Sequence, residues 1–490
     1  MAGGFFRELK HYTVSETAGE LGTSLPEAGR LLGILKKYGI VKAVRASKPE
    51  YENLSNQDII LTDVSENETR AEYVFDFVGV VTLEKYVIKC YPKYITSTAE
   101  PMGQLKKVLK VIRKYNDKEQ TVPVYHGGGE DGNFNWLGVA LYLLEDYFRY
   151  GLYASQLAVI ESNGQGEILW DRTISETTAL IRNNRPYYVE FRTRGTAENE
   201  NDYCRRLHAC ILTRCCAELK ENGILELFDI GELELNASVP EDFGEADFIL
   251  YRLERELRQQ YVTRKQILLK TLYSYIAGKN VERQESSLGL YGTNSFNLVW
   301  ERVCGDAFGN MREKRLGELP CGISGDFASD RRLIDLIDRP LWHRQNPPGT
   351  DAKSSTFLPD ILCIHQVEDT DEYCFGIYDA KYYCMEFRQQ GDGCKVVGQP
   401  GVEDVAKQYL YRMAYEEFIE AQGFRHVWNM FLFPQEKTEP EYAWVEMKMF
   451  RGPIIAAKLC AEEMYDLYLA DRKIKMENLE LIWNMGKQAE

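Results

Sequence analysis

The chain has 490 residues, of which 44% are hydrophobic and 27% are charged, and its formal net charge is −16. This length exceeds one ordinary domain, and the composition is that of a globular protein. The acidic balance excludes a protein that grips nucleic acid over its whole surface, because neutralising phosphates requires clustered Lys and Arg. Any contact with nucleic acid must therefore be local or shared with a partner.

Neither a membrane span nor an export signal is expected. No run of about eighteen apolar residues occurs, and the opening residues MAGGFFRELKHY carry a charge inside their apolar patch. We therefore predict a cytoplasmic protein without membrane contact, whose twelve cysteines are reduced thiols. A structural zinc site is the alternative for the densest cysteine cluster, although its spacing lacks paired C-x-x-C knuckles. This cluster comprises Cys204, His208, Cys210, Cys215 and Cys216.

The first fifty residues are basic, with eight Lys/Arg against five Glu. Residues 14–38 predict two short helices, the second opened by a Ser24-x-x-Glu27 capping box, and a strand follows. Residues 11–46 therefore resemble a winged helix-turn-helix, whose recognition helix would enter the major groove of DNA. A small helical module that docks a protein remains an equal alternative. On the DNA-binding interpretation, the contacts would come from Arg30, Lys36 or Lys37.

From about residue 73 the pattern changes to strands. YVFDFVGVV and KYVIKCYPKYI predict a hairpin with its turn at Thr82–Glu84. Two amphipathic helices are predicted next, in LKKVLKVIRKY and NWLGVALYLLEDYFRYGLYAS, followed by a strand-rich segment over residues 166–191 and a helix in YCRRLHACILTRCCAELKENG. No G-x-x-x-x-G-K-[ST] occurs in the chain, so we expect no NTPase site of its own.

Two apolar runs, FLPDILCIHQ and DEYCFGIYDAKYY, predict a second hairpin joined by the acidic turn VEDTDE. Charged groups are costly to bury unless they are paired or hold a metal. We place Asp360 on the first strand, while Asp379 and Lys381, two residues apart, point to one face of the second. Two carboxylates and an ammonium group would then converge, which suits Mg²⁺ and the hydrolysis of a phosphodiester. A surface hairpin with a salt bridge is the alternative.

Pro359-Asp360 and Asp379-Ala380-Lys381 resemble the PD-(D/E)xK nuclease superfamily. The resemblance implies that both acids bind metal and that Lys381 orients the attacking water or stabilises the transition state. Upstream, the helical run SFNLVWERVCGDAF turns its apolar residues to the core and leaves Glu301 on another face. Superfamily members commonly place a further metal or water ligand at this point, so Glu301 is the third candidate ligand.

Downstream, EDVAKQYLYRMAYEEFIEAQG predicts a helix with Gln408 and Tyr411 on one face. This resembles the Gln/Tyr helix of several nucleases of the class, although the Tyr follows the Gln by three residues where four is usual. The resemblance implies that Gln408 positions the scissile phosphate or the lysine. HVWNMFLFP then predicts a buried strand. The core order of helix, three strands, helix and strand fits if SSTFLPD or a preceding segment supplies one strand.

The N-terminal hairpin VGVVTLEKYVIKCYPKYI and the segment GEILWDRTI, taken together with the C-terminal nuclease motifs, resemble McrC-type restriction subunits. The nearest match is the LlaJI restriction endonuclease family, a McrC-like branch. The fold class implied is a multidomain α+β chain. It comprises a winged helix-turn-helix module (residues 1–50), a mixed α/β McrC-like domain for motor docking (51–280) and an α/β PD-(D/E)xK nuclease domain (281–490). The implied partners are double-stranded DNA, a McrB-like AAA+ GTPase that uses the GTP, and a second copy of the chain for double-strand cleavage.

The resulting hypothesis is a type II/IV-like restriction endodeoxyribonuclease of phage defence that requires Mg²⁺. Its ligands would be Asp360, Asp379 and Glu301, and its further catalytic residues Lys381 and Gln408. Two alternatives remain at this stage: a DNA-binding regulator whose hairpin is only structural, and a scaffold that activates the motor through a non-catalytic nuclease-like fold.

Overall fold

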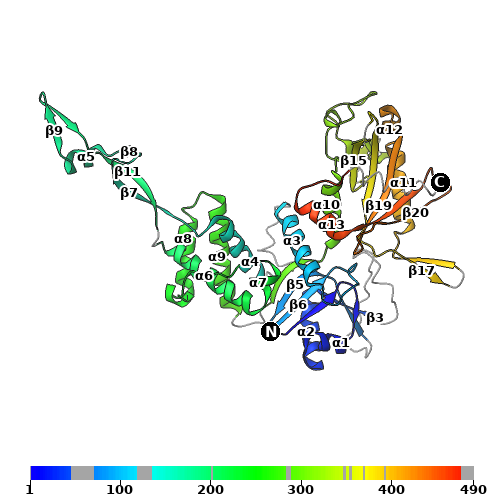
Figure 1. Ribbon diagram of the computed structural model, residues 1–490, viewed down its shortest axis with the longest axis horizontal. Helices are drawn as coiled ribbons and strands as arrows, with labels where there is room; N and C mark the ends of the chain where they lie inside the picture. Colours follow the sequence, from blue (N-terminus) through cyan, green and yellow to red (C-terminus); the bar gives the residue numbers. More distant parts are fainter. Residues whose placement is uncertain are drawn as a thin grey trace. The chain divides into compact units, whose positions relative to one another are not determined.

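The structure is a computed structural model that describes residues 2–45, 71–118, 135–199, 202–282, 288–345, 349–352, 356–367, 370–390 and 393–475. The chain forms two compact units (Figure 1). The first unit combines Met1–Pro123 with Leu290–Glu490, and the second is Val124–Gly289. Helices and several separate sheets occur in the same chain, which confirms a mixed α/β architecture.

The first unit begins with two helices and a small antiparallel sheet. Helices α1 (Val14–Leu21) and α2 (Leu25–Lys37) confirm the two helices expected here. The sheet has the order β2 (His11–Tyr12), β4 (Ala71–Phe75), β3 (Val41–Arg45). The capping box predicted at the start of α2 is wrong, because the Ser24 side chain makes no cap hydrogen bond. A capping box instead opens α1, where Thr13 and Glu16 satisfy each other's backbone N–H groups.

A four-stranded sheet follows in the order β1, β6, β5, β12. Its bounds are Ala2–Arg7 for β1, Tyr86–Tyr91 for β6, Val78–Leu83 for β5 and Leu288–Thr293 for β12. Strands β5 and β6 confirm the expected hairpin, but its turn is shorter than predicted: Thr82 and Leu83 belong to β5, and the turn is Glu84, with a φ of 55°, and Lys85. The run YVFDFVGVV is not one strand, because it divides between β4 and β5, which belong to different sheets. Helix α3 (Met102–Lys118) comes next.

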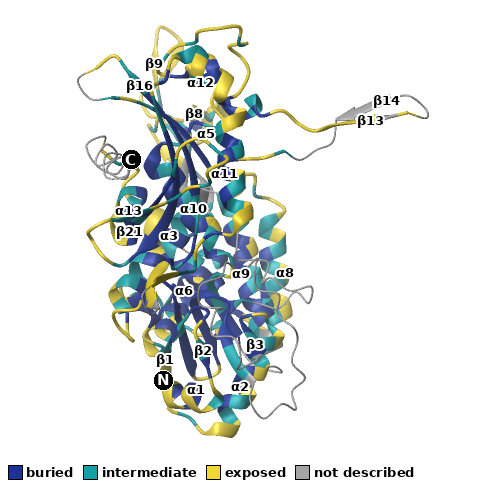
Figure 2. Cartoon of the chain, turned by 90° about the vertical axis from the view of Figure 1, so that its right-hand side faces the viewer, coloured by how far each residue is buried: buried dark blue, intermediate teal, exposed yellow. Residues whose placement is uncertain are grey.

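The C-terminal part of this unit is built on a five-stranded sheet, in the order β15, β16, β19, β21, β20. Strands β15 and β16 are antiparallel, β16, β19 and β21 run parallel, and β20 is antiparallel to β21. Strand β16 is buried along nearly its whole length (Figure 2). The bounds are Ile361–Gln366 for β15, Tyr373–Ala380 for β16, His426–Gln435 for β19, Glu441–Val445 for β20 and Ile454–Cys460 for β21.

Helices cover both faces of this sheet. Helices α10 (Phe296–Phe308) and α13 (Ala461–Leu469) lie on one face, where the Phe308 ring contacts Tyr378 at 5.1 Å. Helices α11 (Val402–Ala414) and α12 (Glu416–Gln422) lie on the other, where Phe375 contacts Phe418. One continuous helix was expected over α11 and α12, but Tyr415 separates them. Residues 356–360 form no strand, so the described part of SSTFLPD does not supply the third strand expected there, and residues 354–355 lie outside the described residues.

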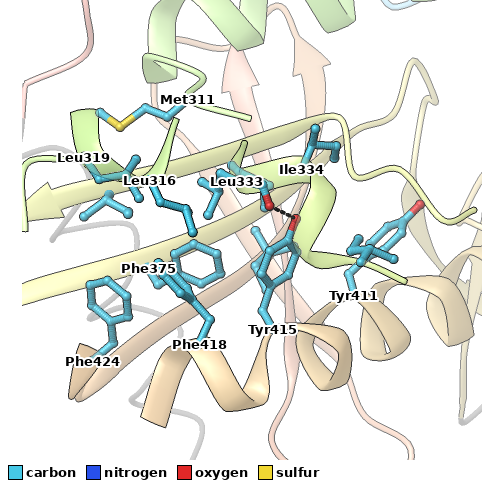
Figure 3. Close-up of a cluster of buried hydrophobic side chains, with 14 residues drawn as sticks. Met311, Leu316, Leu319, Leu333, Ile334, Phe375, Tyr411, Tyr415, Phe418 and Phe424 are labelled. Carbon is cyan, nitrogen blue, oxygen red and sulfur yellow. Dashed lines mark hydrogen bonds between the residues drawn. The ribbon is translucent and has the colours of Figure 1, made fainter. Parts of the chain in front are cut away.

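A cluster of apolar side chains fills the space between the sheet and α11 and α12 (Figure 3). Phe375 of β16 lies in it beside Tyr415, Phe418 and Phe424. The Tyr415 hydroxyl donates a hydrogen bond of 3.1 Å to the Leu333 carbonyl, which satisfies its one buried polar atom. This packing holds the hairpin of β15 and β16 against α11.

Two short ribbons and two single 3₁₀ turns complete the first unit. The ribbons pair β13 (Leu341–Arg344) with β14 (Gly349–Ala352), and β17 (Glu386–Gln390) with β18 (Gly393–Val397). The 3₁₀ turns are Leu316–Glu318 and Leu333–Leu336.

The second unit combines a helical bundle with a projecting β-arm (Figure 1). The helices are α4 (Trp136–Tyr150), α6 (Tyr203–Glu221), α7 (Ile224–Leu227), α8 (Ala246–Leu257) and α9 (Thr263–Glu282), with a 3₁₀ turn at Pro240–Phe243. The arm contains β7 (Gln156–Ser162), β8 (Glu167–Ile168), α5 (Trp170–Glu176), β9 (Ala179–Arg182), β10 (Arg185–Tyr188) and β11 (Arg192–Glu198). Helix α5 was not expected within the strand-rich segment.

The cysteine cluster of α6 is part of the bundle core. His208 is buried and its Nδ1 accepts a hydrogen bond from the Tyr153 N–H at 3.1 Å. All twelve cysteines are free thiols. Over the described part of the chain, no helix is long and apolar enough to cross a membrane.

Candidate functional site

The hairpin of β15 and β16 brings two carboxylates together at the carboxyl end of β16. Ile361 pairs with Tyr378, so Asp360, the residue before β15, lies beside Asp379. The Ala380 N–H donates a hydrogen bond of 2.9 Å to Asp360 Oδ2. Asp360 was expected on the strand itself, and it instead lies directly before it, where β15 has not yet begun.

Burial and neighbouring charge both act on Asp360. Its pKa is raised well above the ordinary value, first by burial, then by the negative charges of Asp379 and Glu301 and by a hydrogen bond with Asp379. The Ala380 N–H opposes this shift only in part. Asp360 is therefore a buried carboxylate held close to two other acids, and a cation bound between Asp360 and Asp379 would relieve the repulsion.

Lys381 is the nearest cation to this pair. Its Nζ lies 2.9 Å from Asp379 Oδ2 and 3.0 Å from Asp404 Oδ1. Burial alone would lower the pKa of the ammonium, but the two carboxylates outweigh burial and raise it above the ordinary value. The Lys381 ammonium is therefore a fixed positive charge. Its backbone N–H separately donates a hydrogen bond of 2.9 Å to the Leu432 carbonyl of β19.

Glu301 approaches the same place from α10. Burial raises its pKa, the positive charge of Arg312 opposes the rise, and the charge of Asp379 adds to it. The Glu301 carboxylate lies 3.9 Å from the Arg312 guanidinium. A pocket of about 520 Å³ opens here, and Glu301, Asn310, Arg312 and Asp360 contribute to its walls.

Asn310 and Arg312 hold the backbone of Asp360, and the sequence reasoning missed both. The Asn310 side chain donates to the Asp360 carbonyl at 2.8 Å and accepts from the Leu362 N–H at 3.1 Å. Arg312 donates to the same carbonyl at 3.2 Å. Helix α10 ends at Gly309, whose φ of 69° turns the chain toward Asp360. That glycine is the one sequence signal that could have directed attention to this segment.

Gln408 lies in the core between the helix and the sheet. Its Nε2 donates to the carbonyls of Ile377 at 2.9 Å and Met430 at 3.3 Å, and its side chain is fully buried. Tyr411, one turn later, donates to the Leu358 carbonyl at 3.2 Å. The residue of α11 that contacts Lys381 is Asp404, one turn before Gln408, and sequence reasoning missed it.

The donor set is suited to a hard cation but is small. Asp360 and Asp379 offer carboxylate oxygens, which Mg²⁺ prefers, and this ion usually completes its shell with waters and phosphate oxygens. Within the described ranges, no group of three or more His, Cys, Asp or Glu side chains is arranged to hold a metal ion. Asp360, Asp379 and Lys381 thus lie together, and Glu301 is near enough for its charge to act on Asp360. Gln408 lies in the core between α11 and the sheet.

Arg30, a candidate for DNA contact, is engaged by two acids. Its guanidinium donates to Glu27 at 2.8 Å and to Glu84 at 2.8 Å. Lys36 and Lys37 lie in the last turn of α2. Arg30 is exposed but its charge is already paired, so Lys36 and Lys37 are the better candidates on this helix for a contact with DNA.

Comparisons with known proteins define the class of this protein as restriction endonucleases. Residues 77–458 match the family described as LlaJI restriction endonuclease. This match spans well over half of the chain, and the chain belongs to the LlaJI restriction endonuclease family.

A curated relative and two solved structures are also similar. The relative is the type II restriction enzyme BsuMI component YdjA of Bacillus subtilis (strain 168), 27% identical over 91% of this chain and 90% of its own length. The first structure is a half-complex of Thermococcus gammatolerans McrB AAA+ hexamers with bound McrC. Its matching chain is 12% identical, with a TM-score of 0.39 over 97% of this chain and 100% of that chain. The second is the McrBC complex of the same organism, 14% identical, with a TM-score of 0.23 over 61% and 85%.

Proposed function

We propose that this chain is the nuclease subunit of a restriction system and hydrolyses phosphodiester bonds of double-stranded DNA with Mg²⁺. The observation that carries the proposal is the convergence of Asp360, Asp379 and Lys381 at the end of one buried hairpin. Membership of a restriction endonuclease family supplies the class of reaction. The surrounding helices and parallel strands support assigning residues 281–490 to a PD-(D/E)xK nuclease domain.

The metal would be held by Asp360 and Asp379, with Glu301 as a third ligand. The crowding of these carboxylates, which raises the pKa of Asp360 and Glu301, favours a bound cation. When bound, Mg²⁺ supplies an activated water and stabilises charge on the phosphate. Lys381 orients that water or neutralises the charge that develops on the phosphate oxygens, and Asn310 keeps Asp360 in position through its backbone. We also assign Gln408 a supporting role, because it holds α11 on the sheet and α11 carries the residue that contacts Lys381.

A protein partner is favoured by the arm of the second unit. Its β9–β10 hairpin exposes apolar side chains, among them Ile181 at 77% and Leu180 at 60% of their surface. Such exposed apolar groups mark contact surfaces. The similar Bacillus subtilis protein is named as a component of an enzyme, which supports a chain that acts with other subunits. We propose a McrB-like AAA+ GTPase, bound through residues 51–280, with GTP used by that partner.

The remaining parts of the proposal concern the start of the chain and its assembly. We propose that residues 1–50 form a winged helix-turn-helix-like module that contacts DNA near Lys36 and Lys37. Two copies of the chain would cut the two strands, in the cytoplasm. This resembles type II and type IV restriction activity.

Plasmid cleavage tests the proposal. The chain is incubated with plasmid and Mg²⁺, with and without the proposed McrB-like AAA+ GTPase and GTP. We expect cleavage with Mg²⁺, none with a chelator, and loss by at least 100-fold in Asp379→Ala, because the carboxylate pair is broken. Asp371→Ala, which removes an exposed acid from the far end of the same hairpin, is the matched control and should cleave normally.

Two outcomes would contradict the proposal. If Asp379→Ala cleaves as well as the natural chain, the hairpin is structural. If the natural chain binds DNA but never cleaves under any of these conditions, the chain is a DNA-binding regulator or a scaffold that activates the motor.

A further inference from the structure

Lys381 is bound by two carboxylates that come from different elements. Asp379 lies on β16, two residues before Lys381, which directly follows the end of that strand, and its Oδ2 is 2.9 Å from Lys381 Nζ. Asp404 lies on α11, 23 residues further along the chain, and its Oδ1 is 3.0 Å from the same nitrogen. All three side chains are at most one-fifth exposed, so these contacts are shielded from the solvent screening that weakens surface ion pairs.

Hydrogen bonds to the hairpin fix the position of helix α11, and with it the position of Asp404. Asp404, Gln408 and Tyr411 stand at i, i+4 and i+7, and therefore share one face of the helix. Gln408 donates to a carbonyl of β16, and Tyr411 donates to the Leu358 carbonyl just before β15. Because these two residues tie the helix to both arms of the hairpin, the position of Asp404 relative to Lys381 is set by the core.

An ammonium group has three N–H donors. Among the described residues, Asp379 and Asp404 are the side chains that bind Lys381 Nζ. Two donors are thereby directed at the carboxylates, and the third is left for a water or a phosphate oxygen. Two anchors restrict the rotation of the group far more than one anchor would, which is the preorganisation that catalysis requires.

We propose that Asp404 is a positioning residue, which holds the Lys381 ammonium in the orientation needed for phosphodiester cleavage. This inference rests on the nuclease function proposed above. Asp379 is also a proposed metal ligand, and a carboxylate shared with a cation attracts an ammonium group less strongly. Asp404 is not part of the Asp360–Asp379 pair, so its charge stays available to Lys381. The raised pKa of Lys381, to which Asp404 contributes, is consistent with this role.

The test compares Asp404→Asn with a matched variant. Asp404 and Glu403 are both acids in the first turn of α11, so both interact with the helix dipole. Glu403 is exposed, and Glu403→Gln therefore removes the same charge without touching Lys381. Asp404→Glu, which keeps the carboxylate, is the rescue variant.

Three quantities are measured on the full chain with any partner that cleavage requires. We expect Asp404→Asn to lower kcat by about 10- to 100-fold, the range typical of residues that orient the ligand groups of metal sites. We expect KM for DNA to change less than about twofold, because the residue does not bind substrate. Glu403→Gln should match the natural chain in both constants, and Asp404→Glu should recover part of kcat.

The third quantity does not depend on cleavage. In metal-free protein, an amine-reactive reagent labels lysines, and peptide mass spectrometry follows Lys381. We expect faster labelling of Lys381 in Asp404→Asn than in the natural chain or in Glu403→Gln, because one of its two anchors is gone.

The outcomes separate this inference from the proposed function. If Asp379→Ala is inactive but Asp404→Asn cleaves and labels like the natural chain, the inference is wrong and the nuclease function stands. If the activity of Asp404→Asn returns at high Mg²⁺, Asp404 is a metal ligand and its positioning role is refuted. If the natural chain never cleaves, the proposed function fails first, while the labelling result still decides whether Asp404 anchors Lys381.

Discussion

His208 is a buried imidazole that stays neutral, and it makes the second unit sensitive to acid. Burial, with a smaller effect from the charge of Arg264, lowers its pKa from 6.5 to about 3. Its Nδ1 accepts a hydrogen bond from Tyr153, which only the unprotonated nitrogen can do. A histidine of this kind carries no penalty above its unfolded pKa, and it costs stability as the pH falls below that value.

Because the pKa of His208 is lowered in the folded protein, acid should destabilise the second unit. Between pH 7 and pH 5 the unfolded state gains a proton that the folded state refuses, so the second unit should lose about 2 kcal/mol. His208→Asn keeps an acceptor but cannot titrate, and it should remove most of that loss. Thermal unfolding of the natural chain and of His208→Asn at pH 7 and pH 5 measures this loss of stability. Equal acid sensitivity in both proteins would mean that other groups are responsible.

At the residue scale, alternation along a strand was enough to predict half of the candidate site. Asp379 and Lys381 are two residues apart, and any strand would point them to one face. Asp404 could not be found in this way, because its contact with Lys381 depends on how α11 packs across the sheet. Asn310 was equally hidden, since its side chain bonds the backbone of Asp360 and Leu362, at the start of β15 about 50 residues later.

Helix α11 joins the parts of the candidate site through hydrogen bonds to the sheet. Gln408 is the centre of this connection, because its two N–H donors reach the carbonyls of neighbouring strands β16 and β19. Its Oε1 is buried, without a hydrogen-bond partner among the described residues. Such a half-satisfied amide is costly to disturb, because its removal leaves two further carbonyls without their donor.

Gln408→Leu should therefore destabilise the first unit by about 1–3 kcal/mol. Lys407→Ala, at an exposed position on the same helix, should have little effect and is the control. Denaturant unfolding followed by the fluorescence of the buried tryptophans measures the difference. A variant with natural stability and no cleavage would instead assign Gln408 a direct part in the chemistry.

At the element scale, periodicity predicted most helices and strands because their apolar faces are regular. Helix α10 appears where the spacing of four apolar residues indicated, and all four are buried: Phe296, Val299, Trp300 and Val303. Two predictions of secondary structure were wrong because the local sequence pattern carries no signal at those places. YVFDFVGVV is apolar throughout, so no pattern marks the point where β4 leaves one sheet and β5 enters another. Helix α5 is short and mostly exposed, and such helices carry little periodic signal.

The whole chain consists of two compact units, and one of them is assembled from both ends of the sequence. The candidate site belongs to the first unit. His208, which has no part in that site, belongs to the second unit. This arrangement was not expected from the sequence, because contacts between residues hundreds of positions apart leave no periodic signal. Tyr94 and Tyr465, whose hydroxyl groups are 2.8 Å apart, are one such pair.

Because the two units have separate cores, thermal unfolding should show two transitions that respond to different conditions. On the proposed function Mg²⁺ would bind the folded first unit, so an excess of about 100-fold over its Kd should stabilise that unit by about 2.7 kcal/mol and raise one midpoint by a few degrees. Asp360→Asn should abolish this shift. Lowering the pH from 7 to 5 should lower the other midpoint, on the order of 5 °C, through His208. Differential scanning calorimetry of the natural chain, Asp360→Asn and His208→Asn assigns each transition. A single transition that responds to both Mg²⁺ and His208→Asn would show that the two units unfold together.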